Sequence, residues 1–221
     1  MNDWGMKKSL KPGYKALFHG PPGTGKTLTA GLFGKLAGVD VYRVDLSMVI
    51  SKYIGETEKN LEKVFAKAEH KNWILFFDEA DSLFGKRASI SDAHDKYPNQ
   101  ETRYFLQQLE DYNGLVILSS NMRGNVDEAF GRRLQSIIYF PIPKSQERGI
   151  LWRQTFSDKT KLEKDLDIDA IAEKYELAGR SIINVVQYAS LMALQRNENI
   201  IWEKDILEGI KKEFRKEGKT V

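Results

Sequence analysis

The sequence predicts a doubly wound α/β fold, with a parallel five-stranded sheet and helices on both faces, followed by a small C-terminal helical domain. Short apolar runs alternate with helical stretches as far as Pro143, a pattern typical of parallel strands that are buried on both faces. A glycine-rich turn, Gly20–Thr27, joins the first run to the first helix. Beyond Pro143 the helical stretches continue without strand-like runs. We therefore expect a large domain over residues 1–143 and a small helical domain over residues 144–221.

The composition of the 221 residues is that of a globular protein, with 41% apolar and 29% charged residues. The net charge of +3 does not call for a nucleic-acid partner. The absence of cysteine excludes disulfides and thiolate metal sites and fits a reducing cytosol, so we expect a cytoplasmic protein. No apolar stretch approaches the roughly 18–20 residues of a membrane span, and no membrane partner is expected.

Each predicted element of the large domain begins from a local pattern. The run Ala16–Phe18 predicts the first strand, and a helix is expected from Lys26 to about Leu36, closed by Gly38. The second strand is predicted at Val41–Val44. An amphipathic helix from Glu56 to His70 follows, because its apolar residues recur at helical spacing: Leu61, Val64, Phe65 and Ala68.

Three continuous apolar runs predict the remaining strands, each expected to be buried: Trp73–Phe77, Leu115–Leu118 and Ile137–Phe140. Between the first two, the polar and aperiodic stretch Gly85–Gln100 predicts a long loop, and such loops are often functional. The helices of the small domain are expected at Ser145–Phe156, Asp167–Tyr175, Arg180–Arg196 and Trp202–Lys216.

The turn after the first strand has the residues of a P-loop. Gly20-Pro21-Pro22-Gly23-Thr24-Gly25-Lys26-Thr27 matches G-x-x-x-x-G-K-[ST] and lies between a strand and a helix. Glycines let backbone N–H groups approach a phosphate without a Cβ clash, and the helix N-terminus favours an anion. Lys26 can reach the β- and γ-phosphates, and the Thr27 hydroxyl can coordinate Mg²⁺. The turn therefore predicts binding of ATP or ADP with Mg²⁺.

The acidic run Asp78-Glu79-Ala80-Asp81 follows the strand Ile74–Phe77. The carboxyl ends of parallel strands are where such folds bind ligands. We expect Asp78 to hold Mg²⁺, directly or through water, and Glu79 to polarise the water that attacks the γ-phosphate. An exposed acidic turn is the alternative, and the nearby phosphate loop argues against it.

The phosphate loop together with Asp78-Glu79 resembles the AAA+ ATPase family, and the likeness covers nearly the whole chain. The resemblance implies ATP hydrolysis in a homo-oligomeric ring, a hexamer, that remodels or translocates protein substrates. Such proteins normally carry a recruiting domain upstream, and Asp3-Trp4-Gly5 would then be the remnant of an adenine-pocket wall. Lys15–Pro143 also resembles AAA+ ATPases of bacterial phage-tail-like contractile injection systems, which would imply a role in their assembly.

The same resemblance assigns further catalytic residues. Asn121 matches a first sensor that helps Glu79 orient water, although asparagine also favours plain turns. Asp127–Arg133 is similar to an arginine-finger segment on a short helix, in which Arg132 or Arg133 would reach the γ-phosphate of the next protomer in the ring. A surface basic pair is the alternative. Arg180 is either a second sensor or an exposed residue at the start of a helix, because the narrower AAA subgroup usually has alanine there.

The segment Lys52-Tyr53-Ile54-Gly55 resembles the central pore loop of protein-remodelling AAA+ machines. An aromatic ring can grip an extended polypeptide by apolar contact, and the glycine lets the loop flex. In the alternative, Tyr53 and Ile54 pack on the core. Gly85–Gln100 falls where a second pore loop would lie.

Two rival functions are open to such a chain. A DNA-acting loader or initiator would need a basic DNA-binding element, and none is evident. A nucleotide-gated scaffold with negligible turnover would not need Glu79, Asn121 or the arginine pair. We therefore expect an ATP hydrolase that acts on protein, without a nucleic-acid partner.

Overall fold

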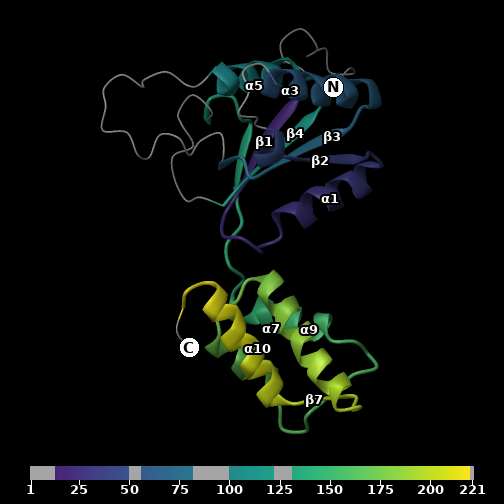
Figure 1. Ribbon diagram of the computed structural model, residues 1–221, viewed down its shortest axis with the longest axis vertical. Helices are drawn as coiled ribbons and strands as arrows, with labels where there is room; N and C mark the ends of the chain where they lie inside the picture. Colours follow the sequence, from purple (N-terminus) through teal and green to yellow (C-terminus); the bar gives the residue numbers. More distant parts are fainter. Residues whose placement is uncertain (1–12, 50–55, 82–99, 122–130, 220–221) are drawn as a thin grey trace, which may run out of the picture. The chain divides into compact units, whose positions relative to one another are not determined.

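The computed structural model describes residues 13–49, 56–81, 100–121 and 131–219 (Figure 1). The chain forms two compact units. The first comprises Met1–Gly20 and Lys26–Phe140, and the second comprises Pro21–Gly25 and Pro141–Val221. Each unit has its own hydrophobic core.

A five-stranded sheet, with all its pairings parallel, forms the first unit, as predicted. Its order is β2-β3-β4-β1-β5. The strands are β1 (Tyr14–His19), β2 (Val41–Asp45), β3 (Ile74–Asp78), β4 (Leu115–Ser120) and β5 (Ser136–Tyr139). Because His19 lies opposite Ser120 and Phe77 lies opposite Leu118, the carboxyl ends of β1, β3 and β4 meet at one edge of the sheet.

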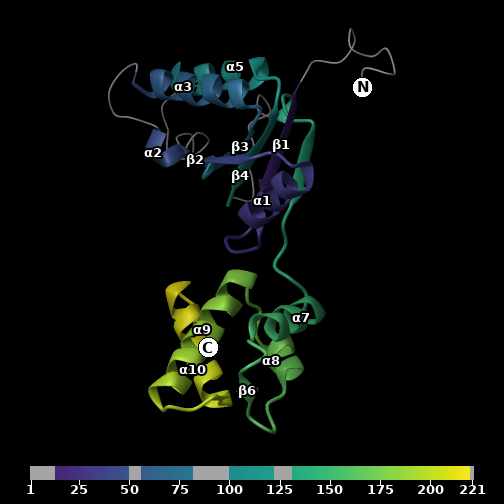
Figure 2. The same ribbon diagram turned by 90° about the vertical axis from the view of Figure 1, so that its right-hand side faces the viewer.

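Helices cover both faces of this sheet (Figures 1 and 2). On one face, α3 (Glu56–Lys71) and α5 (Gln100–Asp111) pack on Leu17, Leu75, Phe77, Val116 and Leu118. On the other face, α1 (Lys26–Ala37) packs through Ala30 on the alternate residues Ala16, Phe18, Ile74, Phe76 and Ile117. The central strands are therefore buried on both faces, which explains their continuous apolar runs.

The last strand differs from its prediction. The run Ile137–Phe140 was expected to be buried, but β5 is the edge strand next to β1. Its residues Ile137, Ile138 and Tyr139 are 52%, 41% and 40% exposed. An apolar run alone does not distinguish an edge strand from a central one, so the prediction of a buried strand was wrong.

Two helices of the first unit were not predicted. The short α2 (Leu46–Val49) follows β2 directly, and α5 begins at Gln100, the last residue of the predicted loop. Residues 82–99 of that loop lie outside the described residues. The apolar residues of α5, Phe105, Leu106 and Leu109, recur at helical spacing and are buried, so the signal was present in the sequence.

The second unit contains α7 (Ser145–Thr155), α8 (Ile168–Lys174), α9 (Gly179–Gln195) and α10 (Glu203–Lys216), close to the predicted spans. Its core includes the fully buried Trp152, Ile182, Val185, Ile206 and Ile210. The buried Arg148 of α7 donates through Nε to the Ala172 carbonyl of α8 at 2.8 Å. The expectation that strands stop at Pro143 was wrong, because β6 (Lys161–Leu162) pairs in parallel with β7 (Ile200–Ile201).

Among the helices in the described ranges, none has both the length and the apolar character that crossing a membrane requires.

Candidate active site

The glycines of the phosphate loop adopt backbone conformations that side chains rarely allow. Gly20, Gly23 and Gly25 have φ values of 145°, 77° and 102°. At Gly20 a Cβ atom would lie 2.2 Å from the carbonyl oxygen of Phe140, whose N–H donates to the His19 carbonyl at 2.7 Å. The chain after β1 therefore passes so close to the end of β5 that only glycine fits at position 20.

Lys26 is the most enclosed cation of the described site, with 6% of the residue exposed. Its Nζ donates to the Gly20 carbonyl at 2.8 Å, which folds the side chain back along the loop. Burial lowers the pKa of Lys26, and the negative charges of Asp78 and Asp81 oppose that shift. The ammonium group thus lies within the field of both carboxylates.

The two threonines of the loop differ in environment. The Thr24 hydroxyl donates to the Pro21 carbonyl at 2.9 Å and closes the turn. Thr27 is exposed in the first turn of α1. An exposed hydroxyl at a helix N-terminus can still serve as a hard oxygen ligand for Mg²⁺.

Asp78 and Glu79 lie at the end of β3 in different environments. The Asp78 side chain is 14% exposed and accepts from Arg43 of β2 at 2.7 Å through Oδ2. Its Oδ1 accepts from the backbone N–H of Glu79 at 3.1 Å. Glu79 is exposed and has a φ of 54°, a left-handed conformation that is uncommon for a residue with a side chain. The chain therefore turns sharply at Glu79, and the carboxylate next to the metal ligand candidate faces solvent.

Asp81 joins the acidic run to the end of β4. Its Oδ2 accepts from the backbone N–H of Asn121 at 2.9 Å, and its Oδ1 accepts from the Ser120 hydroxyl. The Ala80 N–H donates to the Ser119 carbonyl at 2.8 Å. Sequence reasoning assigned no role to Asp81, although its place as the third acid after a buried strand was a usable signal.

The remaining predicted residues are placed only in part. Arg132 is exposed, and Nε of Arg133 forms an ion pair with Glu110 of α5. Residues Asp127–Phe130 of the predicted finger segment lie outside the described residues. The pore-loop candidates Lys52–Gly55 also lie outside them.

Arg180 lies in the second unit, in the first turn of α9, with an exposed side chain. Its backbone N–H donates to the Gly23 carbonyl at 3.2 Å, and a Cβ at Gly23 would lie 3.0 Å from the Arg180 Cβ. The predicted second-sensor residue and the phosphate-loop segment Pro21–Gly25 are thus neighbours within one unit.

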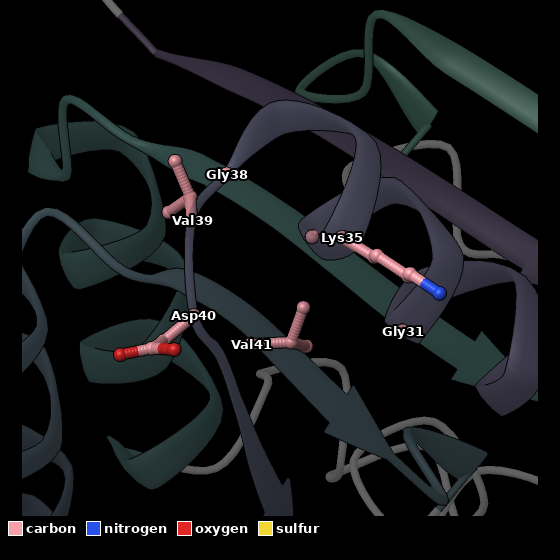
Figure 3. Close-up of a pocket in the computed structure, with 7 residues that line it drawn as sticks. Gly31, Lys35, Gly38, Val39, Asp40 and Val41 are labelled. Atoms are coloured by element: carbon pink, nitrogen blue, oxygen red, sulfur yellow. The ribbon is translucent and has the colours of Figure 1, made fainter.

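A separate pocket of about 330 Å³ lies between the last turns of α1 and the start of β2 (Figure 3). It is lined by Gly31, Gly34, Lys35, Gly38, Val39, Asp40 and Val41. The phosphate loop precedes the first turn of this 12-residue helix, roughly 18 Å away along its axis. The pocket is therefore distinct from the candidate active site.

Comparison with known proteins agrees with this arrangement. Residues 16–142 match the model of the "ATPase family associated with various cellular activities (AAA)". The A-like 1 katanin p60 ATPase-containing subunit of Papio anubis is 32% identical over 213 residues, which cover 91% of this chain and 43% of that protein. The Homo sapiens protein of that name is 33% identical over 206 residues, covering 88% of this chain and 42% of its own. This chain thus spans about two fifths of the length of the curated relatives it matches.

Proposed function

This chain belongs to the AAA family of ATPases and is an ATP hydrolase; from this premise we propose that it works as a homo-oligomeric ring, a hexamer, that uses hydrolysis to remodel or translocate protein. The observation that carries the proposal is the meeting of Lys26, Asp78 and Asn121 where the strands β1, β3 and β4 end. This edge of the sheet is where folds of this class bind nucleotides.

The residues at that edge suit Mg²⁺ and a nucleotide. The Thr27 hydroxyl and the Asp78 carboxylate offer the hard oxygen ligands that Mg²⁺ prefers. Bound there, Mg²⁺ would neutralise phosphate charge. The ammonium group of Lys26 and the backbone N–H groups of the loop would hold the β- and γ-phosphates.

Hydrolysis needs a base and a group that orients water. Glu79 is exposed beside Asp78, and its carboxylate would take a proton from the attacking water. Asn121 would hold that water, because its carboxamide can donate and accept at once. Arg132 or Arg133 would stabilise the transition-state charge in the next protomer, and Arg180 would stabilise that of its own site. We further propose that residues 144–221 act as a lid on the nucleotide.

An apolar stripe on α1 supports self-association. Leu28, Leu32, Phe33 and Leu36 are 78%, 53%, 45% and 77% exposed. Their spacing places them along neighbouring turns, and contiguous exposed apolar side chains are typical of interaction surfaces. A second copy of this chain is the partner that a ring would supply.

The protein substrate would be gripped by Lys52–Gly55 on the ring axis, with Tyr53 as the contacting side chain. The narrower proposal, assembly of a contractile injection system, depends on the resemblance of Val41–Glu62 and Trp73–Arg87 alone. The curated relatives are instead named as katanin p60 ATPase-containing subunits.

Substitution of Tyr53 by alanine tests the remodelling proposal. Basal ATP turnover should stay within about twofold, as is usual for surface positions. Stimulation of turnover by an unfolded protein should be lost. Stimulation by DNA in the parent chain would favour the loader function instead. A large fall in the melting temperature of Tyr53→Ala would identify the residue as core packing, and full stimulation in a stable variant would remove the grip.

A further inference from the structure

Arg43 lies on the same face of the sheet as the candidate metal ligand. In the parallel pairing of β2 with β3, Arg43 is opposite Phe76, and Asp78 follows two residues later. Side chains alternate along a strand, so Arg43, Phe76 and Asp78 share one face. Phe76 packs with Ala30 of α1, which identifies this face as the one that carries α1 and Lys26.

The guanidinium group of Arg43 occupies the oxygen of Asp78 that a metal would use. Its Nη2 lies 2.7 Å from Oδ2, while Oδ1 accepts from the Glu79 N–H at 3.1 Å. Both carboxylate oxygens are thus bound by donors of this chain. Since the Arg43 side chain is 61% exposed, the guanidinium group can leave Asp78 for water at little cost.

We infer that Arg43 is a built-in cation that competes with Mg²⁺ for Asp78 and thereby weakens the coupling between metal and ATP binding. The reason is electrostatic. A second cation beside the metal site repels Mg²⁺, whereas the same charge attracts the phosphates of metal-free ATP. Arg43 therefore makes ATP binding less dependent on Mg²⁺. The inference deepens the proposed function, because it depends on Asp78 being the metal ligand.

The test is the ratio of two dissociation constants for a fluorescent ATP analogue, one measured with EDTA and one with saturating Mg²⁺. In Arg43→Gln this ratio should rise by up to about fivefold, the range expected for an exposed ion pair. The concentration of Mg²⁺ at half-saturation should fall by a similar factor. Arg43→Lys keeps the charge and should stay close to the parent. Arg153→Gln is a matched control, because Arg153 pairs with Asp169 on the second unit with its side chain 53% exposed.

The outcomes separate this inference from the proposed site. Asp78→Asn should abolish the dependence of ATP binding on Mg²⁺; an unchanged ratio there would overturn the metal role of Asp78 itself. If Asp78→Asn behaves as expected while Arg43→Gln keeps the parent ratio and melting temperature, only the role of Arg43 is refuted. A rise in the ratio for both Arg43→Gln and Arg153→Gln would also refute it, because a general charge effect would then suffice.

Discussion

Glu79 is a single residue in which backbone strain and chemistry coincide. Its left-handed φ of 54° costs on the order of 1–2 kcal/mol for a residue with a Cβ. Such strain persists where the surroundings fix the backbone, and here Ala80 is fully buried and bonded to Ser119. The strained turn separates the direction of Glu79 from that of Asp78, so one carboxylate can serve the metal and the next can serve water.

Replacing Glu79 by glutamine should stop hydrolysis and leave binding intact, because the carboxamide keeps the shape but is a poor base. We expect turnover to fall about 10²-fold or more, while the dissociation constant for ATP stays within about twofold. Steady-state phosphate release and an equilibrium titration measure the two. Lys26→Ala is the contrasting variant and should abolish binding. Near-normal phosphate release by Glu79→Gln would exclude Glu79 as the base.

Asp81 is expected to position Asn121 and to sustain the charge of Lys26, and two variants separate these effects. Ser120→Ala removes one hydrogen bond but keeps the carboxylate, so turnover should fall several-fold with no change in pH dependence. Asp81→Asn also removes the negative charge, which lowers the pKa of Lys26 further. ATP affinity should therefore be lost at a lower pH on the alkaline side, and turnover should fall roughly tenfold, as for hydrogen bonds to charged groups. Superimposable pH profiles of ATP affinity for the parent and Asp81→Asn would contradict the charge effect.

At the scale of elements, the packing of α1 on β2 depends on one glycine. A Cβ at Gly34 would lie 2.3 Å from Cγ2 of Val41 and 2.7 Å from the Val39 carbonyl oxygen. Gly31, on the same helix, has open space around the corresponding position. The helix can approach the strand because residue 34 has no side chain.

Gly34→Ala should lower the free energy of unfolding by about 1–3 kcal/mol, as overpacking usually does. Gly31→Ala should be neutral or stabilising by about 0.5–1 kcal/mol, because alanine is the better helix former. Thermal unfolding followed by circular dichroism compares the two, and a shift of roughly 2–4 °C per kcal/mol is expected for a chain of this size. Equal melting temperatures for both variants would show that the contact relaxes freely.

The elements that the sequence predicted well are those with an unambiguous period or a continuous apolar run. The helix at Glu56–Lys71 and the central strands are of this kind, because burial on one face or on both imposes the pattern. Prediction failed where burial and pattern separate. The exposed edge strand β5 has the same apolar letters as a central strand, and the two-residue strands β6 and β7 are too short to show a period.

The candidate site divides in the same way. The phosphate loop and Asp78-Glu79 follow a local motif, so their place at the sheet edge was predictable. The contacts of Arg43 with Asp78 and of Asp81 with Asn121 join residues 35 and 40 positions apart. They depend on the neighbours that the strand order creates, and no local pattern encodes that order.

At the scale of the whole molecule, the proposed ring makes the activity of each protomer depend on the next one. Arg133 is engaged by Glu110 of its own unit, so we expect Arg132 to be the main finger in trans. Loss of such a finger typically costs about 10³-fold or more in rate. ATP turnover per protomer should therefore rise with protein concentration as rings assemble, and a flat response from dilute to concentrated protein would argue against a site completed in trans.

Mixing two inactive chains tests the same architecture directly. A chain carrying Arg132→Ala and Arg133→Ala keeps Glu79 but lacks the fingers, and a Glu79→Gln chain keeps the fingers but lacks the base. At equal proportions about one interface in four would pair an intact Glu79 with an intact finger by chance, because a ring repeats one heterologous contact. Phosphate release should therefore recover to a measurable fraction of the parent rate on mixing. Mixing either chain with Lys26→Ala serves as a control: the Glu79→Gln chain should stay inactive, whereas the finger-free chain should be rescued, since Lys26→Ala still donates fingers. Absence of rescue in mixtures shown by crosslinking to co-assemble would place the catalytic arginine within a single chain.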